Sequence, residues 1–139
     1  MPGNKSLTSY VTEQLAFLGR ISNRGIFGGQ GIFIEERLLG IVIDGALYLH
    51  THTSNIEDYT SRGMQQFKPY PNAFDLTTDH HRVPSEVVEQ PELLKAWGQR
   101  ALEAAVEAAK SKQMAGIERS RHMKQAKKRD KENRRLKKH

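Results

Sequence analysis

The sequence has 139 residues with a net charge of +6, and 37% of them are hydrophobic and 7% aromatic, so it has room for one domain with a core plus an unpacked extension. It contains no cysteine, which excludes disulfides and thiolate metal sites and fits a reducing cytoplasm, the compartment that we expect. The start lacks the apolar region of a signal peptide, and the longest apolar stretches fall short of the roughly 18 residues of a membrane span. We therefore expect no contact with a membrane.

The charge is divided unevenly along the chain. Residues 110–139 contain 13 Lys and Arg against three Asp and Glu, a net charge of +10, whereas residues 1–109 contain nine against 13, a net charge of −4. Such asymmetry is typical of an ordinary domain with an extension directed at a polyanion. We predict an α+β domain over residues 1–109 and a basic tail over residues 110–139, either an extended helix or disordered.

The first predicted element is a helix that Ser6 caps and Gly19 ends. Its apolar residues recur at the spacing of one helical face. They are Leu7, Tyr10, Val11, Leu15 and Leu18.

A glycine-rich segment follows, with four glycines within seven positions. We interpret it as a tight bend from the helix into a sheet, with Phe27 buried and Arg24 pairing or contacting a partner. Consecutive backbone N–H groups could alternatively cradle a phosphate, but neither a Gly-Lys-Ser/Thr ending nor a following helix supports that function. The four glycines are Gly25, Gly28, Gly29 and Gly31.

Alternating apolar residues predict an antiparallel sheet, in which Asp44-Gly45 is a strong hairpin turn and Glu36-Arg37 a weaker one. A capping box at Ser54 and Glu57 opens a short helix, and Pro91 begins a longer one. The five predicted strands are Ile32–Glu36, Leu38–Asp44, Ala46–His52, Gln65–Tyr70 and Phe74–His81. The apolar stripe of the last helix comprises Leu94, Trp97, Ala101, Leu102, Ala105 and Ala108.

The order of elements is thus helix, three strands, helix, two strands, helix. Five short patterns accompany this order, and with it they resemble the N-terminal domain of the TfoX/Sxy family of competence regulators over roughly residues 8–109. The patterns are Arg24-x-x-Phe27-Gly28-Gly29-x-Gly31-Ile32-Phe33, Asp44-Gly45-x-Leu47-Tyr48-Leu49, Phe67-x-x-Tyr70, Val83-Pro84-x-Glu86 and Leu94-x-x-Trp97.

The resemblance implies a two-layer α+β fold similar to the secretion-chaperone-like class, with an antiparallel sheet of about five strands packed by helices. It also implies a non-enzymatic role in regulating DNA uptake, because full-length members assist a transcription activator. Those members have a second, helix-hairpin-helix-like domain where this chain has its basic tail. The same resemblance makes Arg24, Phe27, Gly28, Gly29 and Gly31 the family motif of this sequence.

The histidines offer an alternative function. His50 and His52 lie on one face of a predicted strand, and His80 and His81 lie on another strand, so four imidazoles could converge on a zinc ion. With the Gly28–Gly31 turn they would define a metal- or anion-dependent enzyme or a ligand sensor. A polar end of the sheet is the simpler interpretation, and we expect no catalytic residue, cofactor or metal, since the sequence contains no nucleophile motif.

The basic tail is the best-supported binding feature of the sequence. It contains no aromatic residue, so we expect salt-dependent, non-specific contacts with nucleic acid phosphates rather than base recognition. A merely solvated extension is the alternative. We expect the body to contact a protein partner or a second copy of the chain. The predicted nucleic-acid-binding residues are Arg119, Arg121, Lys124, Lys127, Lys128, Arg129, Lys131, Arg134, Arg135, Lys137 and Lys138.

Overall fold

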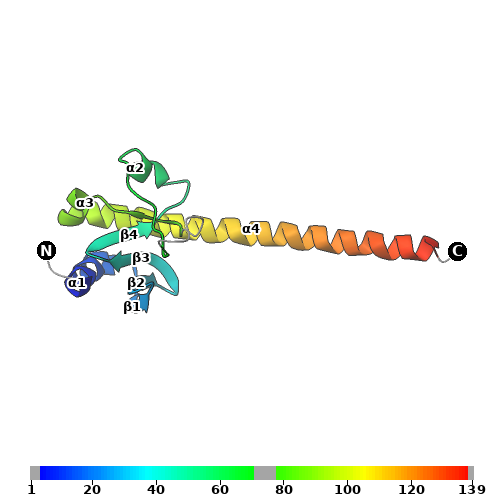
Figure 1. The fold of residues 1–139 in the computed structure, drawn as a ribbon, viewed down its shortest axis with the longest axis horizontal. Helices are drawn as coiled ribbons and strands as arrows, with labels where there is room; N and C mark the ends of the chain where they lie inside the picture. Colours follow the sequence, from blue (N-terminus) through cyan, green and yellow to red (C-terminus); the bar gives the residue numbers. More distant parts are fainter. Residues whose placement is uncertain (1–3, 71–77, 138–139) are drawn as a thin grey trace. The chain divides into compact units, whose positions relative to one another are not determined.

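The structure is a computed structural model that describes residues 4–70 and 78–137, with side chains described from residue 6 through residue 114. Its described part divides into two compact units, and the boundary falls after Val106 (Figure 1). Within the described residues no helix is long and apolar enough to cross a membrane. The elements are α1 (Asn4–Leu15), the 3-10 turn η1 (Ala16–Leu18), β1 (Ile21–Ile26), β2 (Gly29–Ile34), β3 (Arg37–Ile43), β4 (Ala46–His50), α2 (Ile56–Thr60), β5 (His80–Arg82), α3 (Ser85–Glu89) and α4 (Pro91–Lys137).

The five strands form one antiparallel sheet in the order β1-β2-β3-β4-β5. The first four follow one another through two-residue turns whose residues all have positive φ, as type I′ hairpins require. The turns are Phe27-Gly28, Glu35-Glu36 and Asp44-Gly45. The prediction of Asp44-Gly45 is confirmed, and that of Glu36-Arg37 is wrong by one residue.

The predicted α+β fold is confirmed, but the strands are distributed differently. The glycine-rich segment is not a bend from helix to sheet: it contains the end of β1, the Phe27-Gly28 turn and the start of β2. The sequence prediction missed β1 because its polar residues and Gly25 do not alternate with apolar ones. Gly28 was the one sequence signal for this hairpin, because glycine readily adopts the positive φ that a two-residue turn requires.

The second half of the predicted sheet also needs correction. Residues Gln65–Tyr70 contain only an isolated bridge, Gln66 to His81, and the last strand is His80–Arg82. Most of the predicted strand Phe74–His81 lies outside the described residues. The predicted capping box is wrong as well, because α2 begins after Asn55 without a side-chain cap.

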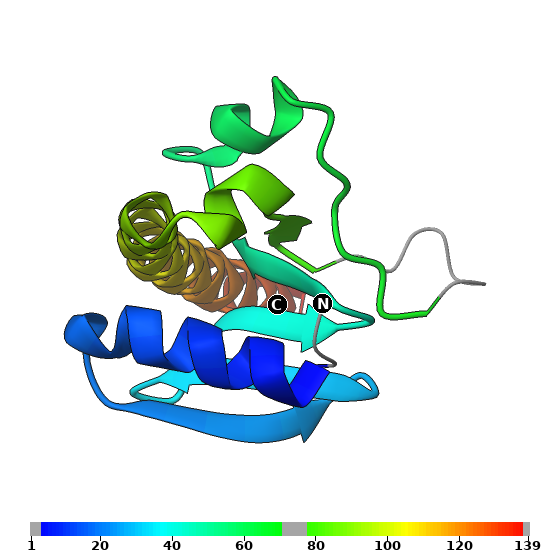
Figure 2. The ribbon, with the colours of Figure 1, turned by 90° about the vertical axis from the view of Figure 1, so that its left-hand side faces the viewer.

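The hydrophobic core lies between one face of the sheet and the helices (Figure 2). Alternate strand residues such as Ile32 and Leu47 face α1 and the first turns of α4, whose buried residues Leu94, Ala101 and Ala105 confirm the predicted stripe. We call this the helix-covered face and the opposite one the outer face. The architecture therefore has two layers, as expected.

Helix α1 begins at Asn4, before the predicted cap at Ser6, and Gly19 follows the η1 turn. Helix α4 begins at Pro91, as predicted, and continues through Lys137. Of the two alternatives for the tail, the structure therefore has the extended helix over residues 110–137. Ten of the eleven predicted nucleic-acid-binding residues, those up to Lys137, are in this helix, and the eleventh, Lys138, lies outside the described residues.

One buried hydroxyl group gives a test of the core. Tyr59 is 1% exposed between the rings of His81 and Trp97, and its hydroxyl has no hydrogen-bond partner among the described residues. Burial and then the Asp58 carboxylate raise the pKa of this hydroxyl well above its ordinary value. A buried hydroxyl without a partner costs its full desolvation energy.

We therefore expect Tyr59→Phe to increase the free energy of unfolding by about 1 kcal/mol. The matched control is Tyr10→Phe, because the Tyr10 hydroxyl donates a hydrogen bond of 2.8 Å to the Val88 carbonyl. The free energy of unfolding of that variant should fall by about 1 kcal/mol, and denaturant titration measures both variants. Equal losses in both variants would contradict the assignment.

Candidate functional site

The family motif falls on the β1–β2 hairpin. Arg24 in β1 pairs with Gly31 in β2, and its guanidinium lies over the Phe33 ring at 4.4 Å from the centroid. Its Nη2 donates a hydrogen bond of 3.0 Å to Glu36 Oε2. Arg24 therefore pairs within the chain, as one of its two predicted roles allowed, although both partners of the ion pair remain exposed.

Two of the motif glycines lie in tightly packed positions. A Cβ on Gly31 would lie 2.7 Å from Phe33 Cε2, and one on Gly29 would lie too close to the Val42 carbonyl oxygen of the neighbouring strand. Both residues belong to β2, and their backbone takes part in the sheet. The backbone of Gly29 and Gly31 does not favour the phosphate-cradle alternative, because a cradle needs N–H groups that a loop leaves free.

Four aromatic rings lie in contact one after another, in the order Tyr70, Phe27, Phe67 and Tyr48. We call these four residues the aromatic cluster. Ring centroids are 5.6 Å apart for Phe27 and Phe67, 4.9 Å for Tyr48 and Phe67, and 6.5 Å for Phe27 and Tyr70. Phe27 is half-buried rather than buried as predicted, and Tyr70 is 57% exposed.

The aromatic cluster borders an open groove of about 710 Å³, which Ile43, Asp44 and residues 65–69 also line. Tyr48, Phe67 and Tyr70 belong to the family patterns of the sequence and Phe27 to its glycine-rich segment, but the convergence of their rings could not be predicted from spacing. Aromatic rings partly exposed at the rim of a groove are typical of a surface that binds another protein.

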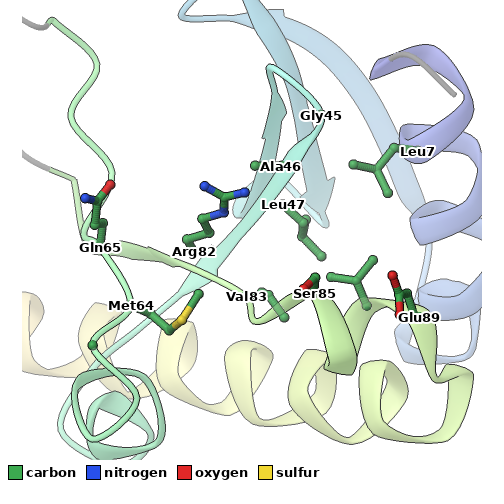
Figure 3. A pocket seen from close by; sticks show the side chains of 12 residues that line it. Leu7, Gly45, Ala46, Leu47, Met64, Gln65, Arg82, Val83, Ser85 and Glu89 are labelled. Atoms are coloured by element: carbon green, nitrogen blue, oxygen red, sulfur yellow. The ribbon is translucent and has the colours of Figure 1, made fainter. Parts of the chain in front are cut away.

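A second cleft of about 440 Å³ opens beside the other side of the Asp44-Gly45 turn (Figure 3). Leu7, Leu47 and Val83 give it an apolar wall, whereas Arg82 and Glu89 contribute opposite charges. These groups could hold a small polar ligand, but they do not form a recognisable catalytic arrangement.

The four histidines do not converge, which overturns the zinc hypothesis. His50 and His80 pair across β4 and β5 with perpendicular rings 5.0 Å apart, whereas His81, one residue on, points to the opposite face. His52 lies beyond the end of β4. Among the described residues no group of three or more His, Cys, Asp or Glu could hold a metal ion.

The two histidines of β5 have structural partners instead. His80 Nε2 donates to the Leu38 carbonyl at 3.3 Å, so its Nδ1 accepts from the Thr78 hydroxyl at 3.0 Å. His81 Nδ1 is hydrogen-bonded to the Thr51 hydroxyl at 2.7 Å. Burial and the imidazole of His50 lower the pKa of His80 from 6.5 to about 4. His80 is therefore a neutral, buried part of the sheet at pH 7.

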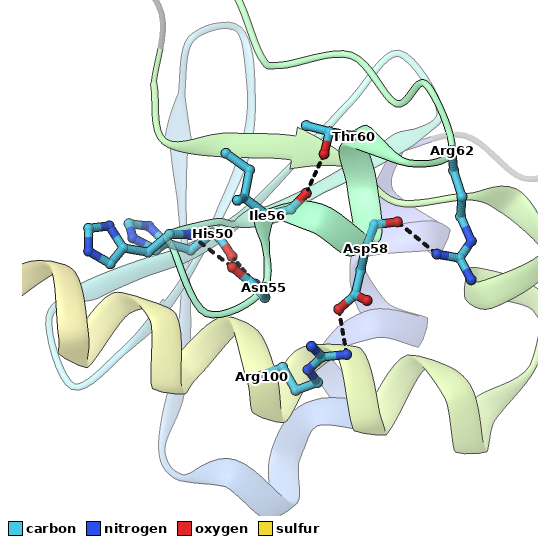
Figure 4. Close-up of polar contacts among 8 residues, drawn as sticks. His50, Asn55, Ile56, Asp58, Thr60, Arg62 and Arg100 are labelled. Atoms are coloured by element: carbon cyan, nitrogen blue, oxygen red, sulfur yellow. Dashed lines mark hydrogen bonds and ion pairs between the residues drawn. The ribbon is translucent and has the colours of Figure 1, made fainter.

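Polar contacts hold α2 against the sheet and the first turns of α4 (Figure 4). Asn55 accepts a hydrogen bond from the His52 backbone and donates one to the His50 carbonyl, and Asp58 forms an ion pair with Arg100. These groups are engaged with one another, so they stabilise the fold rather than form a site.

The sheet, the helices on one face and the motif hairpin define the class of the protein: a two-layer α+β domain with an open groove beside its aromatic cluster. The TfoX N-terminal domain model matches residues 13–105, and the chain belongs to that family. The chain is also similar to the DNA transformation protein TfoX1 of Aliivibrio fischeri, with 29% identity over 86 residues. The matched segment covers 62% of this chain and 41% of that relative, so the chain spans about two fifths of the relative's length.

Proposed function

We propose that this protein is a non-enzymatic regulatory or adaptor protein of the cytoplasm that acts in the control of DNA-uptake competence. The single observation that carries the proposal is the family match over residues 13–105, in which the motif hairpin lies. The similarity to a protein named for DNA transformation points in the same direction. The groove beside the aromatic cluster supports binding of a protein partner rather than catalysis.

We further propose that the basic tail adds non-specific nucleic acid affinity. Residues 110–139 have a net charge of +10, and cations this frequent can neutralise several phosphates at once. Each phosphate that a cation neutralises releases counterions, so affinity should fall steeply with salt. Because the tail lacks aromatic residues, the binding should not distinguish base sequences.

Nucleic acid binding by the full chain tests the tail. Replacing its eleven predicted cations by Gln should weaken binding to a DNA duplex by more than about 100-fold at 50 mM salt, measured by fluorescence anisotropy. A smaller variant, Lys127→Gln with Lys128→Gln and Arg129→Gln, should reduce the slope of log affinity against log salt by up to about three.

The matched control removes three exposed cations of the body, Arg20, Arg37 and Arg82, by the same change to Gln. It should leave the salt slope unchanged. If the body and tail variants weaken binding equally, the affinity does not reside in the tail. If neither does, the nucleic acid proposal fails while the regulatory role stands.

A further inference from the structure

The two edges of the sheet differ in what covers them. Beyond β5, the segment 65–67 takes the place of a further strand, because Gln66 bridges to His81 and Phe67 N–H donates to the His80 carbonyl at 2.8 Å. Beyond β1, no described residue forms a backbone hydrogen bond with the strand from outside the sheet. Its four central residues are all exposed. The edge of β1 is therefore open (Figure 2).

The hairpin geometry tells which backbone groups of β1 face outward. In a two-residue hairpin the residues that flank the turn, here Ile26 and Gly29, form a hydrogen-bonded pair. Hydrogen-bonded and non-hydrogen-bonded pairs then alternate along the strand. Ile21, Asn23 and Gly25 consequently direct their N–H and C=O groups away from β2.

The open edge lacks the usual protection against strand addition. Proteins place lysine, proline or a bulge on such an edge, yet β1 contains none of these, and the irregularity of the sheet lies between β2 and β3. The one charge of the strand, on Arg24, is held over Phe33 and paired with Glu36 within the same chain. A Cβ on Gly25 would meet nothing closer than 4.0 Å, so no neighbouring side chain packs against this position of the strand.

We propose that β1 pairs with β1 of a second copy of this chain, antiparallel and about a two-fold axis at Asn23, to form a continuous sheet across a homodimer. This inference deepens the proposed function, since it rests on the body being an interaction module. The three outward-facing residues of each strand then form about six hydrogen bonds with those of the other. Ile21 stands opposite Gly25 of the second copy, and Arg24 stands opposite Ser22 of the second copy.

Self-complementarity selects this register over its neighbours. An axis at Arg24 would set two guanidinium groups directly opposite each other, which is destabilising. An axis at Ser22 would leave the outward groups of Gly25 without a partner. Only an axis at Asn23 uses all three outward-facing residues and separates the two arginines, so the second copy fits this edge without change.

Sedimentation velocity of the full chain tests the proposal. Protein concentrations of about 1–500 µM are needed, because an interface of one short strand from each copy is small and small interfaces are weak. A salt concentration of 0.3 M screens the tails and keeps nucleic acid affinity out of the result. The wild-type chain should show a reversible monomer–dimer equilibrium. Asn23→Lys and Asn23→Glu should each be monomeric, because each sets like charges opposite each other at the axis, and an equimolar mixture should form heterodimers.

The control variant is Thr12→Val, which removes the same side-chain contact with Asn23 that both charged variants lose but leaves the strand intact. It should dimerise like wild type. Asn23→Pro should also be monomeric yet folded by circular dichroism, since its missing N–H points outward. A wild-type chain that stays monomeric, or charged variants that dimerise alone, would overturn the proposal whatever the tail binds.

Discussion

Replacing Gly29 by alanine is expected to lower the free energy of unfolding by about 2–4 kcal/mol, the largest effect of any single methyl group that we predict. The added Cβ would lie 2.8 Å from Ile43 Cβ and closer still to the Val42 carbonyl oxygen. Both contacts are with atoms of β3 that cannot rotate away, and Gly29 is buried. The hairpin must therefore separate from β3 or distort.

Gly25→Ala is the matched control, because it makes the same chemical change in the same hairpin. Its Cβ would have no neighbour within 4 Å other than the Gly29 carbonyl at that distance. The variant should be neutral or stabilised by about 0.4–1 kcal/mol, since alanine reduces the entropy of the unfolded chain. Denaturant titration of the two variants measures the contrast. Similar stabilities would show that the sheet does not constrain Gly29.

Acid is expected to destabilise the fold through His80. The folded pKa of about 4 lies below the ordinary value of 6.5, so the unfolded chain takes up a proton that the folded chain excludes. This contribution to stability is complete above pH 6.5 and is lost as the pH falls from 6.5 towards 4. Between pH 7.5 and pH 5.0 the loss should be about 2 kcal/mol.

The measurement compares the free energy of unfolding of wild type and His80→Gln at both pH values. The variant removes the titrating group, so its stability should change less over this range even if it is lower at pH 7.5. His50 and His81, which disfavour the charged form of His80, and Asp79, which favours it, remain in both proteins, so the difference between them reports the titration of His80 together with its interactions with these groups. Identical pH dependence of the two proteins would contradict the assignment.

Much of the fold could be predicted from local pattern. The Asp44-Gly45 turn, the amphipathic start of α4 at Pro91 and the strands on either side of residue 44 depend on neighbours in sequence, and these predictions are confirmed within a few residues. The missed strand β1 is different, because it owes its place to pairing with β2 and has four exposed central residues. Periodicity cannot detect a strand that buries so little of its surface.

The candidate sites show the same division. The histidine hypothesis was wrong because sequence spacing cannot tell that His80 and His81 lie on opposite faces from each other and that the carbonyl of Leu38 and the hydroxyl of Thr51 engage them. The aromatic cluster was only partly anticipated, since Tyr48 and Phe67 meet through the path of residues 65–70 over the outer face.

The sequence by itself determined the parts of the protein: an acidic body of mixed helices and strands, a basic tail and a glycine-rich motif of a recognisable family. These properties follow from residue identity and short-range spacing. Only the tertiary structure decided what the motif does, because Gly29 is required by its contact with the Val42 carbonyl and Gly31 packs against the Phe33 ring. It also decided that the sheet ends in an open strand, since an edge exists only once all the other strands have found their partners.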